Sequence, residues 1–297
     1  MSNTTNEMSR LSTQKSSGNN NTLCRSFTMQ RRTLKSALIS IAILAATPQN
    51  GYSADPAAEL WSALKQDVFG AKAIREDSKV VVLEAPSRAE DAAYVPIRIK
   101  IAGDRAASVK SVTLLIDTNP SPLAAVFRYG PAAGGDKAER VIETRVRMDS
   151  YSNVRAVAET TDGQLHMATA FVKASGGCSA PSPKDSDAGS KDFGKVVVRH
   201  LNGDKAGLAQ VMIRHPNNNG LQMDPISRNF IPANFIQAIS IRRNGDTFMD
   251  IESGISISSD PNYRFSFSPD WSHDIKVVAR GLDETLFEGQ STDSATQ

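Results

Sequence analysis

Residues 112–129, VTLLIDTNPSPLAAVFRY, contain two apolar runs, 112–116 and 125–129, on either side of the turn residues Pro120-Ser121-Pro122. Short runs rich in branched and aromatic side chains, bounded by proline and serine, predict strand, turn, strand. Five more runs of this kind lie at 80–83, 94–101, 141–148, 154–158 and 165–172, and the last follows a hairpin signal, Asp162-Gly163. About seven short strands in about 95 residues are typical of an immunoglobulin-like sandwich.

The composition changes after this region. Residues 174–192, ASGGCSAPSPKDSDAGSKD, are poor in apolar side chains and rich in Gly, Ser, Pro and Asp, which is the composition of a linker. Strand-like runs then return at 195–200, 209–214, 235–243, 247–251, 263–267, 275–279 and 285–287, with Asn244-Gly245 as a second hairpin turn. A second, smaller β-sandwich of about 100 residues is therefore expected beyond the linker.

A helical pattern precedes the first strand. Residues 57–69 place Leu60, Trp61, Leu64 and Val68 at helical spacing, and Gly70 can end the helix. We therefore predict an all-β fold with a short N-terminal helix and two immunoglobulin-like β-sandwich domains, packed on one another. The domains are expected at 55–178 and 194–297, joined by a flexible linker over 179–193.

Residues 1–54 are expected to form a leader that is absent from the mature protein. A basic stretch with Arg31-Arg32 precedes an apolar run of about eleven residues, which is too short for a membrane span and typical of a signal peptide. Cleavage is expected near Ala46 or Ala54, by the general or the twin-arginine route, and Met29 is the expected true start. Export to the periplasm follows from this interpretation.

Removing the leader changes the charge and the cysteine count. Six of the 34 basic and one of the 32 acidic side chains precede Asp55, so a formal charge of +2 becomes about −3. The basic footprint of a nucleic-acid-binding protein is then missing. Of the two cysteines, Cys24 lies in the leader, which leaves Cys178 as a single thiol.

Common catalytic and cofactor motifs are missing from the sequence. There is no dinucleotide or phosphate-binding glycine motif, no Cys or His pair at zinc spacing and no nucleophile elbow. The four histidines, His166, His200, His215 and His273, are scattered. We expect no cofactor, no metal site and no catalytic residues, so that the protein is not an enzyme by itself.

Cys178 is the most distinctive side chain, because two flexible glycines, Gly176 and Gly177, precede it. The thiol is expected to be presented and not packed, and an extended arm beyond Val172 could carry it roughly 20 Å. With a reference pKa of about 8.5, the thiol must be activated by deprotonation before it reacts. Lys173 and Lys184 are the only nearby cations in the sequence, so we expect a partner to supply the activation. An unpaired exported thiol is otherwise incidental or joined to another molecule.

Several separated motifs then carry a resemblance to a known family. Residues 61–181 resemble SoxY, the sulfur-carrier subunit of periplasmic thiosulfate oxidation, and residues 207–289 resemble its partner subunit SoxZ. The motifs are 117–124 (DTNPSPLA), 144–147 (TRVR), 154–158 (VRAVA) and 176–178 (GGC) in the first part, and 214–216 (RHP), 231–236 (IPANFI), 244–245 (NG) and 261–267 (PNYRFSF) in the second. Both modules in one chain are similar to the fused SoxYZ-like carriers associated with quinoprotein dehydrogenases.

The resemblance implies a role for the cysteine. Cys178 would hold a sulfane-sulfur or thiosulfonate intermediate covalently, Gly176 and Gly177 would form the flexible arm, and the partners would be Sox-type enzymes, a quinoprotein dehydrogenase or cytochrome c. SoxY itself ends in Gly-Gly-Cys-Gly-Gly, whereas Ser179-Ala180-Pro181 and a further module follow here. A non-covalent accessory subunit and a thiol-linked dimer are the alternatives.

Three polar residues of these motifs have two possible roles, in the fold or on a docking surface. They are Asp117, Asn119 and Arg147. An Asp-x-Asn-Pro sequence at a strand end most often shapes a turn through side-chain bonds to its own backbone, and we favour that interpretation for Asp117 and Asn119.

Overall fold

A computed structural model describes residues 55–76, 79–134, 138–183, 189–201, 207–267 and 274–291. The predicted leader, with Cys24 and Met29, lies outside the described residues. The remainder belongs to one compact unit, Ser53–Gln297. No helix among the described residues is long and apolar enough to cross a membrane.

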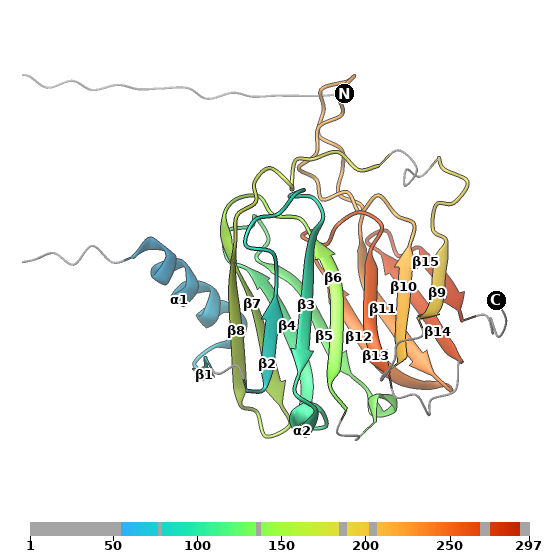
Figure 1. The fold of residues 1–297 in the computed structure, drawn as a ribbon. Coiled ribbons are helices and arrows are strands. Elements are labelled where there is room, and N and C mark those ends of the chain that lie inside the picture. Colours follow the sequence, from blue (N-terminus) through green and yellow to red (C-terminus); the bar gives the residue numbers. More distant parts are fainter. Residues whose placement is uncertain are drawn as a thin grey trace, which may run out of the picture. The chain divides into compact units, whose positions relative to one another are not determined.

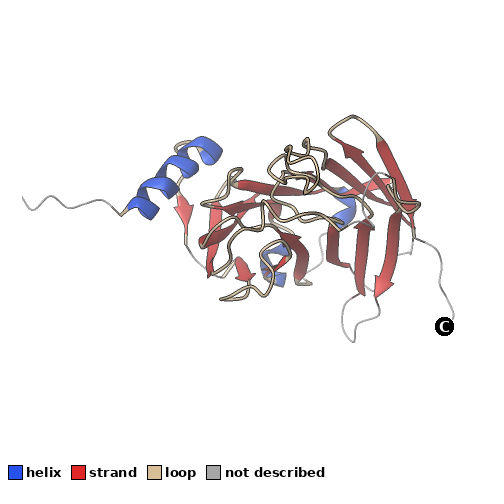
Figure 2. Ribbon diagram, turned by 90° about the horizontal axis from the view of Figure 1, so that it is seen from above, coloured by secondary structure: helices blue, strands red, loops and turns tan. Residues whose placement is uncertain are grey.

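The chain forms two sheets that pack face to face (Figures 1 and 2). The first module supplies β1 (Ile74–Arg75), β2 (Val81–Glu84), β3 (Val95–Ile101), β4 (Val109–Ile116), β5 (Leu123–Tyr129), β6 (Arg140–Val146), β7 (Ser152–Thr160) and β8 (Leu165–Val172). The second supplies β9 (Val196–Leu201), β10 (Gly207–Ile213), β11 (Ile236–Arg243), β12 (Asp246–Ser253), β13 (Asn262–Phe267), β14 (Ile275–Gly281) and β15 (Leu286–Gln290). The predicted all-β fold with one N-terminal helix is confirmed.

The two modules share their sheets. The nine-stranded sheet runs β1-β8-β7-β4-β5-β12-β11-β14-β15 and the six-stranded sheet runs β2-β3-β6-β13-β10-β9. The antiparallel pairs β5–β12 and β6–β13 join the modules, with Phe127 opposite Ile251 and Ile142 opposite Phe265. The sequence pattern predicts two sandwiches packed on one another. The structure corrects this prediction, because the sheets of the two modules join edge to edge.

The core follows from strand alternation. In β3, Val95, Ile97, Ile99 and Ile101 are all buried, and the residues between them are exposed or half-buried. One cluster of buried apolar residues runs through both modules, from Val81 in β2 to Ala279 in β14. This continuous core makes the two modules one packing unit.

Helix α1 (Pro56–Phe69) covers part of the outer face of the nine-stranded sheet. Asp55 caps it by accepting a hydrogen bond from the Ala57 N–H, and Gly70 ends it at φ 63°. Its residues Trp61, Val68 and Phe69 pack on a second apolar cluster formed by Leu115, Val157, Leu165 and Met167. Sequence reasoning missed the four-residue helix α2 (Gly103–Ala106), the 3-10 turn at Pro131–Ala133 and β1, which are all too short for a periodic pattern.

The two hairpin signals differ in outcome. Asn244 and Gly245 both have positive φ, at 51° and 89°, as a two-residue turn of this kind requires. At the other hairpin Gly163 alone has positive φ, at 83°, and the Thr160 N–H donates to the Gln164 carbonyl, which closes a longer loop.

Candidate functional site

The cysteine loop, residues 173–183, leaves β8 and crosses the ends of strands from both modules. Lys173 forms a parallel bridge with Arg88. Further on, the Gly176 N–H donates to the Asp149 carbonyl at 2.9 Å and the Gly177 N–H donates to the Met148 carbonyl at 2.8 Å. The loop is therefore hydrogen-bonded to the segment that follows β6.

Cys178 is packed in this structure. Its exposed fraction is 3%, and its carbonyl accepts a hydrogen bond of 2.8 Å from the Asn219 side-chain amide of the second module. Cys178 forms no disulfide. The expectation that the thiol is presented and not packed is therefore wrong for this conformation, because both modules contribute to a dock that covers the thiol.

The two glycines fit this dock for different reasons. Gly176 has φ +79°, which L residues rarely adopt, and a β-carbon added there would meet no atom within 4 Å. Gly177 instead lies against backbone, and a β-carbon there would come within 2.0 Å of the Ala92 carbonyl oxygen and 2.8 Å of that of Met148. The docked loop therefore requires the absence of a side chain at Gly177. Their role as a flexible arm stays a prediction.

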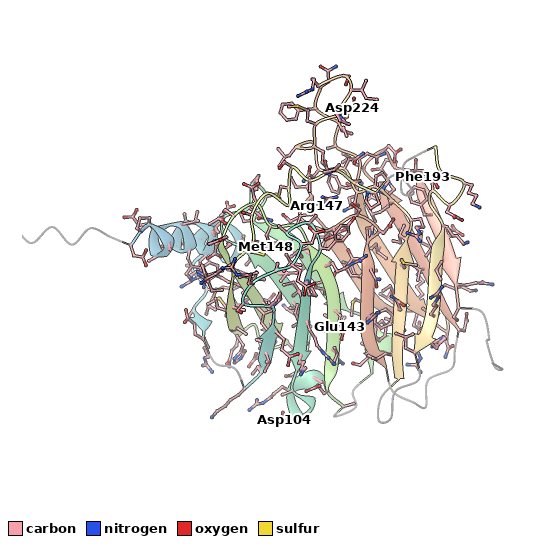
Figure 3. All side chains as sticks on the ribbon, turned by 45° about the horizontal axis from the view of Figure 1, so that its top comes forward. Asp104, Glu143, Arg147, Met148, Phe193 and Asp224 are labelled. Carbon is pink, nitrogen blue, oxygen red and sulfur yellow. The ribbon has the colours of Figure 1, made fainter. Side chains whose placement is uncertain are left out.

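Arg147 holds the loop from below. It directly follows β6 and is fully buried. Its Nη1 donates to the carbonyls of Gly177 and Ala180, both at 3.2 Å, and its Nη2 donates to the Ser182 and Ser259 hydroxyls at 3.2 and 2.5 Å. These four acceptors are neutral, and burial lowers the pKa of Arg147. Figure 3 labels Arg147 and Met148 near the ends of the strands.

The surroundings of Cys178 keep its thiol protonated. Burial and, to a smaller extent, the nearby Asp149 carboxylate raise the pKa of Cys178 to about 11, although the Arg147 guanidinium opposes the rise. Since the thiolate is the nucleophile, the raised pKa slows reaction of the docked cysteine at neutral pH, and its burial restricts access to the sulfur.

Asp117 and Asn119 serve the fold, although not through their own backbone as expected. The Asp117 carboxylate forms a buried ion pair with Arg155 at 2.8 Å, and the Arg155 guanidinium lies 4.0 Å from the centre of the Trp61 ring. The Asn119 amide donates to the Arg147 carbonyl at 2.7 Å and its oxygen accepts from the Asp149 N–H at 3.0 Å. Asn119 thereby fixes the segment on which the cysteine loop docks.

A serine-rich segment of the second module completes the dock, and sequence reasoning missed it. Ser256, Ser258 and Ser259 are buried between the modules. The Arg147 N–H donates to the Ser256 carbonyl at 2.8 Å, and the Ser258 hydroxyl donates to the Ala93 carbonyl at 2.7 Å. Small polar residues look like a solvated turn in a sequence, and only their alternation with Ile255 and Ile257 signals a half-buried segment.

Within the part of the chain that the structure describes, the other polar clusters lie apart from the thiol. The described residues contain no group of three or more His, Cys, Asp or Glu side chains that could hold a metal ion. His215 is buried against Phe193 and Phe287, with ring centres 5.3 and 5.7 Å away, and burial lowers its pKa to about 4. A hollow of about 550 Å³ on the outer face of the six-stranded sheet is lined by paired charges such as Arg98 and Glu143 and not by the cysteine loop.

Two family models match successive parts of the chain. A family model described as sulfur oxidation protein SoxY matches residues 65–178, and one described as sulphur oxidation protein SoxZ matches residues 198–292. A search of curated proteins gives no match.

Two solved structures were also compared. The sulfur carrier protein SoxY from Chlorobium limicola f thiosulfatophilum is 23% identical, with a TM-score of 0.33, over 40% of this chain and 98% of its own. A beta-glycosidase from Bacteroides vulgatus is 12% identical, with a TM-score of 0.22, over 72% of this chain and 24% of its own. The two family models together span most of the chain in the order SoxY, SoxZ, so the protein belongs to the SoxYZ sulfur carriers as a fusion of both modules.

Proposed function

We propose that this protein is a periplasmic carrier that holds a sulfur-containing intermediate covalently on Cys178 and presents it to partner enzymes. The observation that carries the proposal is where the SoxY match ends: its last residue is Cys178 itself, the residue that the dock covers. The chain supplies the attachment point and the scaffold, and the partners supply catalysis.

The dock gives the carrier a resting state. Five hydrogen bonds hold residues 176–180, from Asp149, Met148, Asn219 and, twice, Arg147. At about 1 kcal/mol for each of the three neutral bonds and about 2 kcal/mol for each of the two from the charged Arg147, they contribute about 7 kcal/mol. Freeing five residues returns about 1 kcal/mol of backbone entropy per residue, which offsets most of this energy and leaves the docked state favoured by about 2 kcal/mol. The loop can then leave the dock at a cost that a partner's contacts can offset.

Loading is an oxidation when the cargo is thiosulfate. Joining the Cys178 sulfur to the outer sulfur of thiosulfate forms one S–S bond, releases the thiol proton and removes two electrons. A c-type cytochrome partner is the proposed acceptor for those electrons. The product carries a negative charge, and hydrolysis of its S–SO3 bond by a second enzyme would release sulfate and a proton and leave a persulfide on Cys178.

The proposed partners are Sox-type enzymes, or a quinoprotein dehydrogenase with its cytochrome c. The proposed location is the periplasm, because residues 29–54 have the pattern of a signal peptide and the SoxYZ family transfers sulfur between exported enzymes.

Intact-mass measurement tests the proposal. Protein isolated from the periplasm of its native cells should carry an added mass that a thiol reductant removes, and Cys178→Ser should lack both the mass and the function. A bare thiol during active metabolism, together with full function of Cys178→Ser, would refute covalent carriage.

A non-covalent accessory subunit of an exported quinoprotein dehydrogenase is the second candidate. The burial of Cys178 and its pKa of about 11 favour it, because both suppress reaction at the sulfur. Undiminished activity of the partner complex with Cys178→Ala would select this candidate over the carrier.

A further inference from the structure

A hairpin projects from the second module beside the cysteine loop. We call residues 218–234 the apolar hairpin. The Asn234 N–H donates to the Asn218 carbonyl at its base, and the Ile231 N–H donates to the Gln222 carbonyl further out. Met223 and Phe230 face each other as a β-bridge. Figure 1 shows this excursion beyond the ends of the strands, and Figure 3 labels Asp224 near its tip.

Hydrogen bonds within residues 224–229 hold the tip of the apolar hairpin in one conformation. The Asp224 carboxylate accepts hydrogen bonds from the Ile226 N–H at 3.0 Å and the Ser227 N–H at 2.6 Å, and these bonds lower the pKa of Asp224. The Arg228 N–H donates to the Asp224 carbonyl and the Asp224 N–H donates to the Asn229 carbonyl, both at 2.9 Å. A tip ordered in this way loses little conformational entropy when it binds a partner.

This rigid tip exposes large apolar side chains. Ile226 is 91% exposed, Phe230 65% and Met223 46%. Single exposed apolar residues are ordinary, but three within eight residues on one projecting turn form a patch, and such patches mark interaction sites. A partner that covers them must offer an apolar recess.

The apolar hairpin begins beside the docked cysteine. Its Asn219 donates the hydrogen bond that holds the Cys178 carbonyl. Asp224 lies five residues further out, so the tip projects by at most about 17 Å, the span of a fully extended chain of that length. Cys178 lies five residues beyond the anchored Lys173, so a released loop also reaches about 17 Å. A protein that grips the tip therefore has its surface within reach of the released thiol.

We propose that the apolar hairpin is the docking element for the enzyme that loads or unloads Cys178. That enzyme would receive Ile226 and Phe230 in an apolar recess next to its active-site entrance. This inference rests on the proposed carrier function and adds the surface through which the carrier selects its partner.

Photo-crosslinking in the native cells, with thiosulfate as the sulfur source, tests the inference. A benzophenone amino acid replaces Ile226, and the captured protein is identified by mass spectrometry. Its gene is then deleted, and the Cys178 adduct is measured by intact mass. We expect the deletion to remove the adduct or to make it accumulate.

A second arm measures the rate of adduct formation in periplasmic extract with thiosulfate. Ile226→Ser combined with Phe230→Ser should lower the rate by about tenfold or more, because buried apolar anchors dominate interface energies. Val82→Ser, which changes an exposed valine of β2, is the matched control and should load like the wild type. Alkylation of Cys178 by iodoacetamide should be unchanged in both variants, which shows that the loop itself is intact.

The outcomes separate the two proposals. Capture of another copy of this chain, capture of a protein whose deletion leaves the adduct unchanged, or wild-type loading of the double variant would overturn the docking role while the carrier function stands. If the wild type never acquires an adduct, the carrier function fails, and the identity of the partner fails with it.

Discussion

Replacing Gly177 by alanine should force the cysteine loop out of its dock. The added β-carbon would lie 2.0 Å from the Ala92 carbonyl oxygen and 2.8 Å from that of Met148, closer than carbon and oxygen atoms approach. Both obstacles are backbone atoms of the first module and cannot turn aside. An undocked loop has no such contact, so the substitution destabilises the docked state and leaves the undocked state unchanged.

The expected change in the alkylation rate follows from the pKa of the Cys178 thiol. Undocking should return the pKa of Cys178 from about 11 to about 9, which raises the thiolate fraction at pH 7.5 by about a hundredfold. A less basic thiolate is also a weaker nucleophile, which takes back about tenfold of that gain. Ionisation alone therefore predicts an increase of about tenfold in the rate of alkylation, and loss of steric cover adds to it.

The assay is the rate of iodoacetamide alkylation of the purified protein, followed by intact mass from pH 7 to pH 11. Gly176→Asn is the matched control, because space is open there and asparagine adopts a positive φ more readily than most L residues, so that only a small backbone strain opposes docking. It should react at most about threefold faster than the wild type, and thermal melting should show that both variants fold. A Gly177→Ala thiol that still reacts slowly and titrates near pH 11 would refute the docked state.

Three further predictions concern Asn219 in the dock and the buried residues Asp117 and His215. Asn219→Ala removes the hydrogen bond to the Cys178 carbonyl, worth about 1 kcal/mol, and should speed alkylation about fivefold, whereas an unchanged rate would show that this bond does not hold the loop. Asp117→Ala leaves the buried Arg155 guanidinium without its carboxylate and should lower the free energy of urea unfolding by about 3–5 kcal/mol; a loss below about 1 kcal/mol would contradict the buried pair. Because burial lowers the pKa of His215 to about 4, the unfolded chain takes up a proton first, and stability should fall by up to about 3 kcal/mol as the pH drops from about 6.5 to about 4. Urea titrations over this range should lose that dependence in His215→Phe, and equal slopes would rule the histidine out.

The sequence was sufficient to predict most of the strands and the opening helix. Runs such as 94–101 alternate in burial as a strand requires, and the structure places β3 at Val95–Ile101. The pairing of β5 with β12 could not be predicted, because alternation identifies which face of a strand is buried and not which strand lies beside it.

The sequence was sufficient to identify Cys178 as the candidate site residue, but not to predict that it is buried in a dock. The motif Gly176-Gly177-Cys178 was found, but glycine next to cysteine was interpreted as freedom, whereas Gly177 is also the residue that lets backbone meet backbone. Arg147 was singled out without a role, since nothing in a sequence distinguishes an arginine in solvent from one buried beneath a loop. The buried serines at 256–259 were missed for the same reason.

Fusion of the modules also changes what the loop can do. In this chain the cysteine loop begins at β8 of one module and leads to β9 of the other, and its dock takes Met148 and Asp149 from the first and Asn219 from the second. The sheets of the two modules are continuous through β5–β12 and β6–β13, so the two halves of the dock hold a fixed relative position. Release of the cysteine loop therefore costs only the small excess of its hydrogen-bond energy over backbone entropy, and a partner can release the loop without separating the modules.

Release of the loop should also depend on pH. Since the docked thiol holds its proton up to about pH 11 and a free one only to about pH 9, raising the pH through that range should favour release by up to about 3 kcal/mol. A partner with a cation beside its active-site entrance would achieve the same at neutral pH by stabilising the thiolate outside the dock.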